Sequence, residues 1–534
     1  MPSSTLLLWF LYVLAVTASV VLPRSDPCNR RQTKEIDDAN HLFNAIHSSM
    51  RQWGSSVNHN GMSLFLAQVP AGTQFYHGTH TSTPVQGMEW LAFEPEHARN
   101  FAVKFPKKNR RPPPRSQTYA AGPRAAVDKG IQYSITKDGM AGEDSPERPG
   151  LLEAIFGSPK APRLRPAPSP MKPGWLHTYK TKALTPLLYI DGMSAGKTSK
   201  GTLDVQDILL LNRTDADDDR FWEYERASGL CKLSKERWGG KIKGFIRMEA
   251  GFEIIMCSFD QSLDFQTATR AGSALSKDYT PSRSIWNWIH AVASRYDGIG
   301  GHRVTLDYNN FVTAFSHDMD LFLPDAHLPR LTSTSDQDLN TLRCELDKVV
   351  NDWDSTEDLS AGQFTDWQSV ADMIVARYAT ELKYLTSGRI VDRTHFLKEL
   401  DRLLANFIDS DARDFDAEVA RCVAQNMPGG QVKPSSIAGR ALSLVSTRIC
   451  STLLRAFSTR VDVAQAVADI QSLITYLDWT IWKRCDQCEL GRICFTPVWP
   501  FGSTQDYEHP QCRNESELQS SYGYWDERGA MPAM

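Results

Sequence analysis

The stretch from Pro106 to Pro173 constrains the fold most, because it cannot join a packed core. It is rich in proline, arginine, lysine, glycine and serine, as in KKNRRPPPRSQ and GSPKAPRLRPAPSPMKPG. Such a segment has too few apolar groups to offset the entropy that ordering costs. We therefore predict a disordered insertion over residues 106–173 and a fold assembled from the chain on both sides of it.

The insertion carries the basic cluster Lys107, Lys108, Arg110 and Arg111. A solvated linker is the favoured interpretation of such a charge run. A processing site for a proprotein convertase, or a contact with an anionic glycan, are the alternatives.

The N-terminus predicts export. Leu6 to Val16 is an apolar run of signal-peptide length, and Ala18 offers a small residue for cleavage. The run is shorter than the roughly 20 apolar residues that a membrane span needs. We predict a signal peptide over residues 1–18, with an uncleaved anchor as the alternative because the first residues contain no basic side chain.

Cysteine usage agrees with export, since all ten cysteines lie beyond residue 18 and their number is even. Cys231 with Cys257, and Cys422 with Cys450, are plausible pairs. Four more cysteines in the C-terminal tail predict two disulfides in an oxidising compartment, whereas a zinc site would be the reducing-compartment alternative. These four are Cys485, Cys488, Cys494 and Cys512.

Two triplets, beginning at Asn212 and Asn514, are acceptors for N-glycosylation in an exported protein. The formal net charge of -4 gives no argument for binding nucleic acid or a membrane surface. We predict a secreted glycoprotein with no membrane span after cleavage, and the partner stays open.

Hydrophobic periodicity predicts an α+β fold. Its mixed α/β N-terminal domain would comprise residues 19–105 and 174–328, followed by an α-helical domain over 329–484 and a cysteine-rich tail over 485–534. Strands are predicted at 63–69, 74–76, 186–190, 207–211, 243–248, 253–259 and 303–315, and helices at 37–53, 281–296 and repeatedly beyond residue 330.

Two motifs favour ordinary loops. Gly192 to Thr198 is one residue short of a phosphate-binding loop, which favours a turn rich in small residues. Asp215 to Asp219 alternates carboxylates as a calcium loop does, but Arg220 replaces the required glycine. No metal site is predicted.

The most chemically suggestive region is Phe75-Tyr76-His77-Gly78-Thr79, followed by an aromatic strand and a helix that contains Ala98 and Phe101. This pattern resembles the NAD-binding core of ADP-ribosyltransferases of the diphtheria-toxin and poly-ADP-ribose polymerase type. The alternative is a histidine at a strand end beside an ordinary aromatic core.

The resemblance implies roles for individual residues, with NAD as a substrate. His77, with Gly78 and Thr79, would hold the NAD ribose, and Trp90 would stack on the nicotinamide. Phe101 would match the second aromatic. Glu253, which leads the apolar run EIIMC, would polarise the ribose. A carboxylate there stabilises developing positive charge.

A broader similarity covers LLYIDGMSAGKTSKGTLDVQD, GFIRMEAGFEIIMCSFD and ICFTPVWPFGSTQDYEHPQC. These segments resemble a group of secreted filamentous-fungal proteins without an assigned activity. We therefore expect an extracellular or cell-wall protein. The alternatives are a divergent ADP-ribosyltransferase or NAD glycohydrolase, and a non-enzymatic cell-surface interaction protein.

Overall fold

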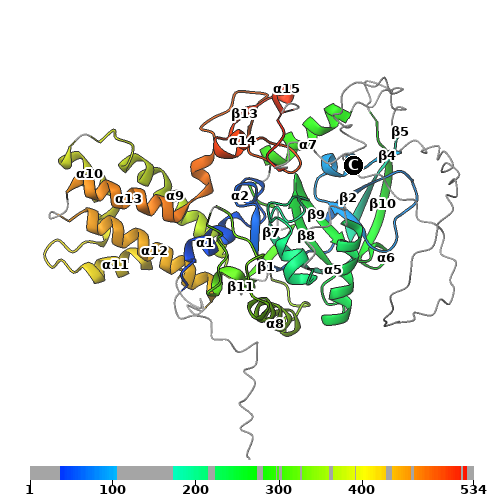
Figure 1. Cartoon of the computed structure of the whole chain (residues 1–534), viewed down its shortest axis with the longest axis horizontal. Helices are drawn as coiled ribbons and strands as arrows, with labels where there is room; N and C mark the ends of the chain where they lie inside the picture. The colour runs from blue at the N-terminus through cyan, green and yellow to red at the C-terminus, as the bar shows by residue number, and fades with distance from the viewer. Residues whose placement is uncertain are drawn as a thin grey trace, which may run out of the picture.

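The computed structural model describes residues 36–104, 172–213, 223–272, 281–295, 297–299, 303–324, 327–359, 365–390, 392–428, 436–458, 462–518 and 521–525. The predicted signal peptide, nearly all of the predicted insertion and the acidic loop at 215–219 lie outside these residues. The described chain has the predicted α+β class, with a mixed N-terminal part, a helical part and a tail closed by disulfides (Figure 1).

A nine-stranded sheet forms the centre of the N-terminal part, in the order β10-β6-β2-β3-β9-β8-β7-β1-β11. The strands β1, β2 and β3, which precede residue 105, lie among strands that follow residue 171. The chain before and the chain after residues 105–171 therefore form one sheet. The strands are β1 (Asn60–Val69), β2 (Gln74–Thr79), β3 (Glu89–Ala92), β6 (Trp175–Thr181), β7 (Thr185–Gly192), β8 (Gly244–Glu249), β9 (Gly251–Met256), β10 (Leu263–Arg270) and β11 (Thr305–Thr313).

Neighbouring strands run antiparallel except β7 and β8, which are parallel. A parallel pair needs a long crossover. Here the crossover contains a π-helix, η2 (Val205–Leu210), and α5 (Glu223–Arg237). A separate short pair joins β4 (Val103–Lys104) to β5 (Lys172–Pro173), which brings the chain on either side of residues 105–171 together.

The helix predicted at 37–53 is two helices, α1 (Ala39–Ser48) and α2 (Gln52–Val57). Met50 between them adopts a positive φ of 53°, a left-handed conformation that a continuous helix does not permit. The apolar residues keep helical spacing across the turn at Met50, because α1 and α2 each bury side chains. Periodicity alone therefore did not reveal the turn.

The prediction of a strand at 207–211 was wrong, because these residues belong to η2. Asp207-Ile208-Leu209-Leu210-Leu211 is a short apolar run, a pattern that buried strands and buried helices share. Several elements were also missed, among them α5 and β10. Helix α5 has a mostly polar surface, and β10 at the sheet edge exposes most of its side chains.

Helices dominate beyond residue 330, as predicted, and form a bundle at one end of the molecule, on the left in Figure 1. Helix α1 packs against α12, α9 and α13, so the N-terminus of the described chain contributes to this bundle. The bundle helices are α9 (Trp367–Leu385), α10 (Arg393–Leu404), α11 (Phe415–Ala424), α12 (Ile437–Ala456) and α13 (Val463–Leu477). The first helix beyond residue 330, α8 (Asp336–Asp352), packs against β11 instead.

Each of these helices begins at a serine or aspartate whose side chain accepts a backbone N–H of the first turn. Such caps stabilise a helix by about 1 kcal/mol each. The cap of α10 is Asp392, whose side chain accepts the backbone N–H of His395. No helix in the described part of the chain combines the length and apolarity of a bilayer span.

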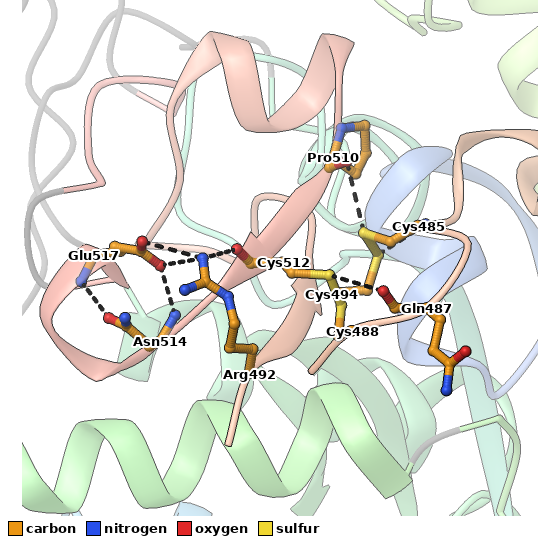
Figure 2. The surroundings of a disulfide bond; sticks show 9 residues. All are labelled: Cys485, Gln487, Cys488, Arg492, Cys494, Pro510, Cys512, Asn514 and Glu517. Carbon is orange, nitrogen blue, oxygen red and sulfur yellow. Dashed lines mark hydrogen bonds and ion pairs between the residues drawn. A yellow bond between two sulfur atoms is a disulfide. The ribbon is translucent and has the colours of Figure 1, made fainter. Parts of the chain in front are cut away.

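Disulfides fasten the described elements. Cys231–Cys257 joins α5 to the end of β9, and Cys422–Cys450 joins α11 to α12. In the tail, Cys485 pairs with Cys494 and Cys488 with Cys512, beside the Arg492–Glu517 ion pair (Figure 2). The tail cysteines are therefore joined to one another as disulfides, which is the arrangement favoured over zinc.

We predict that replacing Cys231 and Cys257 together by serine lowers the free energy of unfolding by about 3 kcal/mol, because the bond closes a loop that is then free in the unfolded chain. Guanidinium denaturation followed by tryptophan fluorescence measures the loss. A change below about 0.5 kcal/mol would contradict it.

Candidate functional site

The sheet separates the two residues that the transferase resemblance depends on. Tyr76 pairs with Ala92, and Ala92 pairs with Glu253, so these three side chains share one face. His77 follows Tyr76 and points to the other face, because successive strand residues alternate. Its ring lies there near Phe259 and His177. The imidazole of His77 and the carboxylate of Glu253 therefore do not meet.

The other predicted residues have structural surroundings. Trp90, two residues before Ala92, shares the face of Glu253, and its carbonyl lies 2.7 Å from His77 Nδ1. A Cβ on Gly78 would lie 1.9 Å from the carbonyl oxygen of Ala98, so glycine permits helix α3 (Pro95–Arg99) to approach β2. Thr79 is buried and pairs with β6, and Phe101 lies beside His97. Their predicted roles toward NAD stay predictions.

Glu253 instead belongs to a buried charge network centred on Arg247. The Arg247 side chain is fully buried, and its Nη2 donates to Glu253 Oε1 at 2.5 Å and to Glu223. Its Nη1 donates to Gln206 Oε1 at 2.8 Å. Arg226 extends the network by binding both Glu223 and Asp207. Strands β8 and β9, η2 and α5 thus meet at one guanidinium.

A second arm of the network surrounds Glu249 at the end of β8. Lys197 Nζ lies 2.9 Å from Glu249 Oε2, and His97 Nε2 lies 3.3 Å from Oε1. Lys197 also lies over the Trp499 ring, 4.9 Å from its centroid, and His97 stacks on Trp288. The lysine of the Gly192–Thr198 loop, predicted to form a turn, therefore binds protein groups.

Burial and ion pairing oppose one another in this network. Burial would raise the pKa of Glu223, but Arg247, Lys197 and Arg226 outweigh it and lower that pKa to about 2. Burial likewise works against a lowered pKa at Glu249, where Lys197 and His97 prevail. At Glu253 burial prevails, with Glu249 and Glu223 adding to it, so its pKa is raised despite Arg247.

The donor atoms of His97, Glu249 and Glu253 lie within 4.8 Å of one another, close enough to bind one metal ion. A cation there would lie against the Lys197 ammonium and the Arg247 guanidinium, which already neutralise the two carboxylates. We therefore assign these side chains to a structural ion network. It ties the sheet to its covering elements.

The network was missed because its members are far apart in sequence. One signal was present: GFIRMEAGFE places Arg247, Glu249 and Glu253 at even spacing around the turn of a hairpin, amid apolar residues. Charges at alternate positions of an apolar hairpin share one buried face, and buried charges require partners.

An open pocket of about 320 Å³ lies at the start of β2 and the end of β3. Polar groups line it, including Gln74, Tyr76, Glu94 and Arg303. Arg303 Nη2 lies 3.4 Å from Glu94 Oε1, and Gln74 Nε2 donates to the Tyr76 hydroxyl at 2.8 Å. Residues 70–73, Phe93 and Pro95 complete the wall.

The two predicted glycosylation residues differ in their surroundings. Asn212 is exposed, and its Oδ1 accepts from Arg343. Asn514 is half-buried at the start of α15 (Glu515–Leu518). Its Oδ1 accepts the backbone N–H of Glu517 (Figure 2) and also that of Ser516. In both residues the oxygen is engaged, whereas a glycan is attached to Nδ2. Glycosylation stays a prediction.

Comparisons with known proteins identify similar chains without an assigned activity. Residues 30–273, which include the sheet strands β1 to β10, match the family model described as the YPL277C N-terminal domain. The chain is 24% identical to the uncharacterized protein YOR389W of Saccharomyces cerevisiae over 89% of its length and 84% of that protein. It is 25% identical to the uncharacterized protein YPL277C of the same yeast, over 66% and 76%. No solved structure matches it significantly.

These comparisons support similarity to proteins of unassigned function, which is the coarser part of the broader resemblance. Secretion and a filamentous-fungal group stay predictions. The comparisons give no support to the resemblance to ADP-ribosyltransferases.

We predict that Arg247→Met lowers the free energy of unfolding by about 3–5 kcal/mol, because it leaves Glu223 and Glu253 buried without their shared partner. Chemical denaturation at neutral pH measures the loss. Lys232→Ala, which removes an exposed pair to Glu236, is the control and should change stability by less than about 0.5 kcal/mol.

Replacing Arg247 by Met together with Glu223→Gln and Glu253→Gln should recover most of the loss, since no carboxylate then remains unpaired. If the triple variant is as unstable as the single one, packing around the guanidinium and not its charge is what matters.

Proposed function

We propose that the protein is exported and acts outside the cytosol as a binding protein, with the pocket beside β2 as its ligand site. The ligand class we propose is a neutral, hydroxyl-rich molecule such as a short oligosaccharide. The observation that carries the ligand class is the charge-balanced, hydrogen-bonding lining of that pocket.

The disulfides support the location. Four bonds join the described elements, and bonds of this kind persist in oxidising compartments but are rare in the cytosol. The apolar run from Leu6 to Val16 and the acceptor triplets at Asn212 and Asn514 point the same way. These features support the proposal of an extracellular or cell-wall site of action.

The lining groups favour recognition over chemistry. The two charged lining side chains, Glu94 and Arg303, form an ion pair, and Glu94 also binds Arg295 at 2.9 Å. Among the lining hydroxyls, Thr73 Oγ1 donates to the carbonyl of Pro70, and the Tyr76 hydroxyl accepts from Gln74. These groups can exchange hydrogen bonds with a ligand, but none is paired with a base that would activate it.

The charge balance selects the ligand class. The lining has one carboxylate, Glu94, and one guanidinium, Arg303, which lie 3.4 Å apart, so the pocket offers donors and acceptors without a net charge. An anion or a cation would meet one repulsive partner for each attractive one. Sugar hydroxyls both donate and accept, and can therefore use the carboxylate, guanidinium, amide and phenol together.

Export is tested by expressing the whole chain in a fungal host. We expect the protein in the medium, with its N-terminus beginning after residue 18 and a mass that falls on enzymatic removal of N-glycans. Leu11→Arg, which interrupts the apolar run, should retain the protein in the cell. Intracellular protein with free thiols would refute export.

Binding is tested by screening the secreted protein against soluble glucan, chitin and mannan oligosaccharides, followed by calorimetry on any that bind. We expect Arg303→Ala to weaken binding about tenfold or more, since it removes a guanidinium from the wall. Lys232→Ala, far along the exposed face of α5, is the matched control and should bind as the native protein does. Absence of binding by a folded, secreted native protein would reject the ligand site while leaving export intact.

A further inference from the structure

A second cavity, of about 40 Å³ and partly open to solvent, lies where α1, the ends of β1 and β7, and the residue after α13 come together. Its volume suits an ion with one or two waters, since one water needs roughly 10–15 Å³ measured in this way. The lining includes Asn44 and Ser48 of α1, Asn60 and Asp191 at the ends of the two strands, and Asp478.

Three lining side chains bring buried oxygens that have no hydrogen-bond partner among the described residues: Asn44 Oδ1, Asn60 Oδ1 and Ser48 Oγ. The residues are 4%, 3% and 5% exposed, so bulk water does not solvate them. Unpartnered buried oxygens are uncommon, because each costs about 1–3 kcal/mol. Three around one cavity indicate an occupant.

Backbone carbonyls fix the orientation of both amides. Asn44 Nδ2 donates to the carbonyl of Leu477 at 2.9 Å. Asn60 Nδ2 donates to the carbonyls of Lys200 at 2.7 Å and Pro329 at 3.1 Å. Turning either amide over would set oxygen against oxygen. The two unpartnered amide oxygens are therefore acceptors, which require a hydrogen-bond donor or a cation, and the Ser48 hydroxyl can accept as well as donate.

Two carboxylates add to this surplus of acceptors. Asp191 Oδ1 accepts from the backbone of Ser63 at 2.8 Å, and a Cβ on Gly61 would lie 2.1 Å from it. Burial raises the pKa of Asp191 to about 7, and the hydrogen bonds from Ser63 offset only part of that. No cationic side chain among the described residues forms an ion pair with Asp191. Burial also raises the pKa of Asp478, which Lys483 and His327 oppose.

Two histidines, His41 and His327, also line the cavity, and His327 is exposed. Burial lowers the pKa of His41 to about 4, so its ring is neutral at neutral pH. The ring packs between Phe315 and Phe322, with centroids 5.3 and 4.6 Å away. The cavity thus combines carboxylates, amide oxygens and a hydroxyl, which is the donor set of a hard cation.

We propose that this cavity binds a calcium ion through oxygens of Asn44, Ser48, Asn60, Asp191 and Asp478. Calcium accepts irregular sets of carboxylate, amide and hydroxyl oxygens, whereas magnesium requires near-octahedral geometry and retains several waters. Zinc prefers nitrogen and sulfur, whereas the unpartnered buried atoms of this cavity are oxygens. The ion would join α1, the sheet and the end of α13, three segments far apart in sequence.

The test uses the full-length protein, stripped with a chelator and dialysed, and measures the melting temperature during titration with calcium. We expect calcium to raise the melting temperature and to bind at about one ion per chain by calorimetry, with weaker effects of magnesium and sodium. Elemental analysis of the protein before stripping gives an independent measurement.

Asp191→Asn is the decisive variant, because it removes the carboxylate that has no counter-charge and preserves its shape. We expect it to lose the response to calcium while remaining at least as stable as the stripped native protein. Asp264→Asn, an exposed aspartate of β10, is the matched control and should respond as the native protein does. Ser48→Ala should weaken binding about tenfold without preventing folding.

An unchanged melting temperature with all three cations, or a native-like calcium response from Asp191→Asn, would overturn the proposal and leave the cavity to water alone. A response to zinc alone would overturn it as well. The outcome does not depend on the pocket beside β2, since no sugar enters the experiment.

Discussion

The N-terminal part of this protein depends on one buried guanidinium. Arg247 binds Glu223 and Glu253 at the same nitrogen and Gln206 at another, and so joins β8, β9, α5 and η2. Removing a guanidinium from water is costly, and only partners in place on every side offset that cost. The parallel crossover between β7 and β8 carries two of these partners. The crossover must therefore reach its native position for the Arg247 charge to be neutralised.

The network also explains why Glu253 resembled a catalytic residue in the sequence. In some enzymes the active site contains a glutamate at the start of an apolar strand. The same sequence pattern arises here for a different reason, because Glu253 binds Arg247, which lies three residues before Ala250 on the preceding strand. Arg247 and Glu253 are cross-strand partners in register. From the sequence alone the pairing is visible only if the turn at Ala250-Gly251 is recognised, because the turn determines which residues face one another.

The sequence predicted the elements whose pattern is local and missed those that tertiary contacts determine. We predicted the strands rich in β-branched and aromatic residues and the long helices of the bundle. Each buries one face, which requires apolar residues at regular spacing in the sequence. Helix α5 was not, since its role is to supply Glu223 and Arg226 and its outer surface is polar. The cavity with Asn44, Asn60 and Asp478 could not be predicted either. Its residues are ordinary polar side chains that only the packing of α1 and α13 brings together.

The pairing of β4 with β5 has a consequence for what the chain can carry between these two strands. Val103 lies opposite Pro173 and Lys104 opposite Lys172, so the protein fixes both ends of residues 105–171 at one point of its surface. A segment inserted between these two strands would begin and end at the same pair, so it would leave the order of the strands in the sheet unchanged. Closing a loop whose ends already meet costs only about 0.6 kcal/mol more for each doubling of its length, so the site between Lys104 and Lys172 can accommodate an added module.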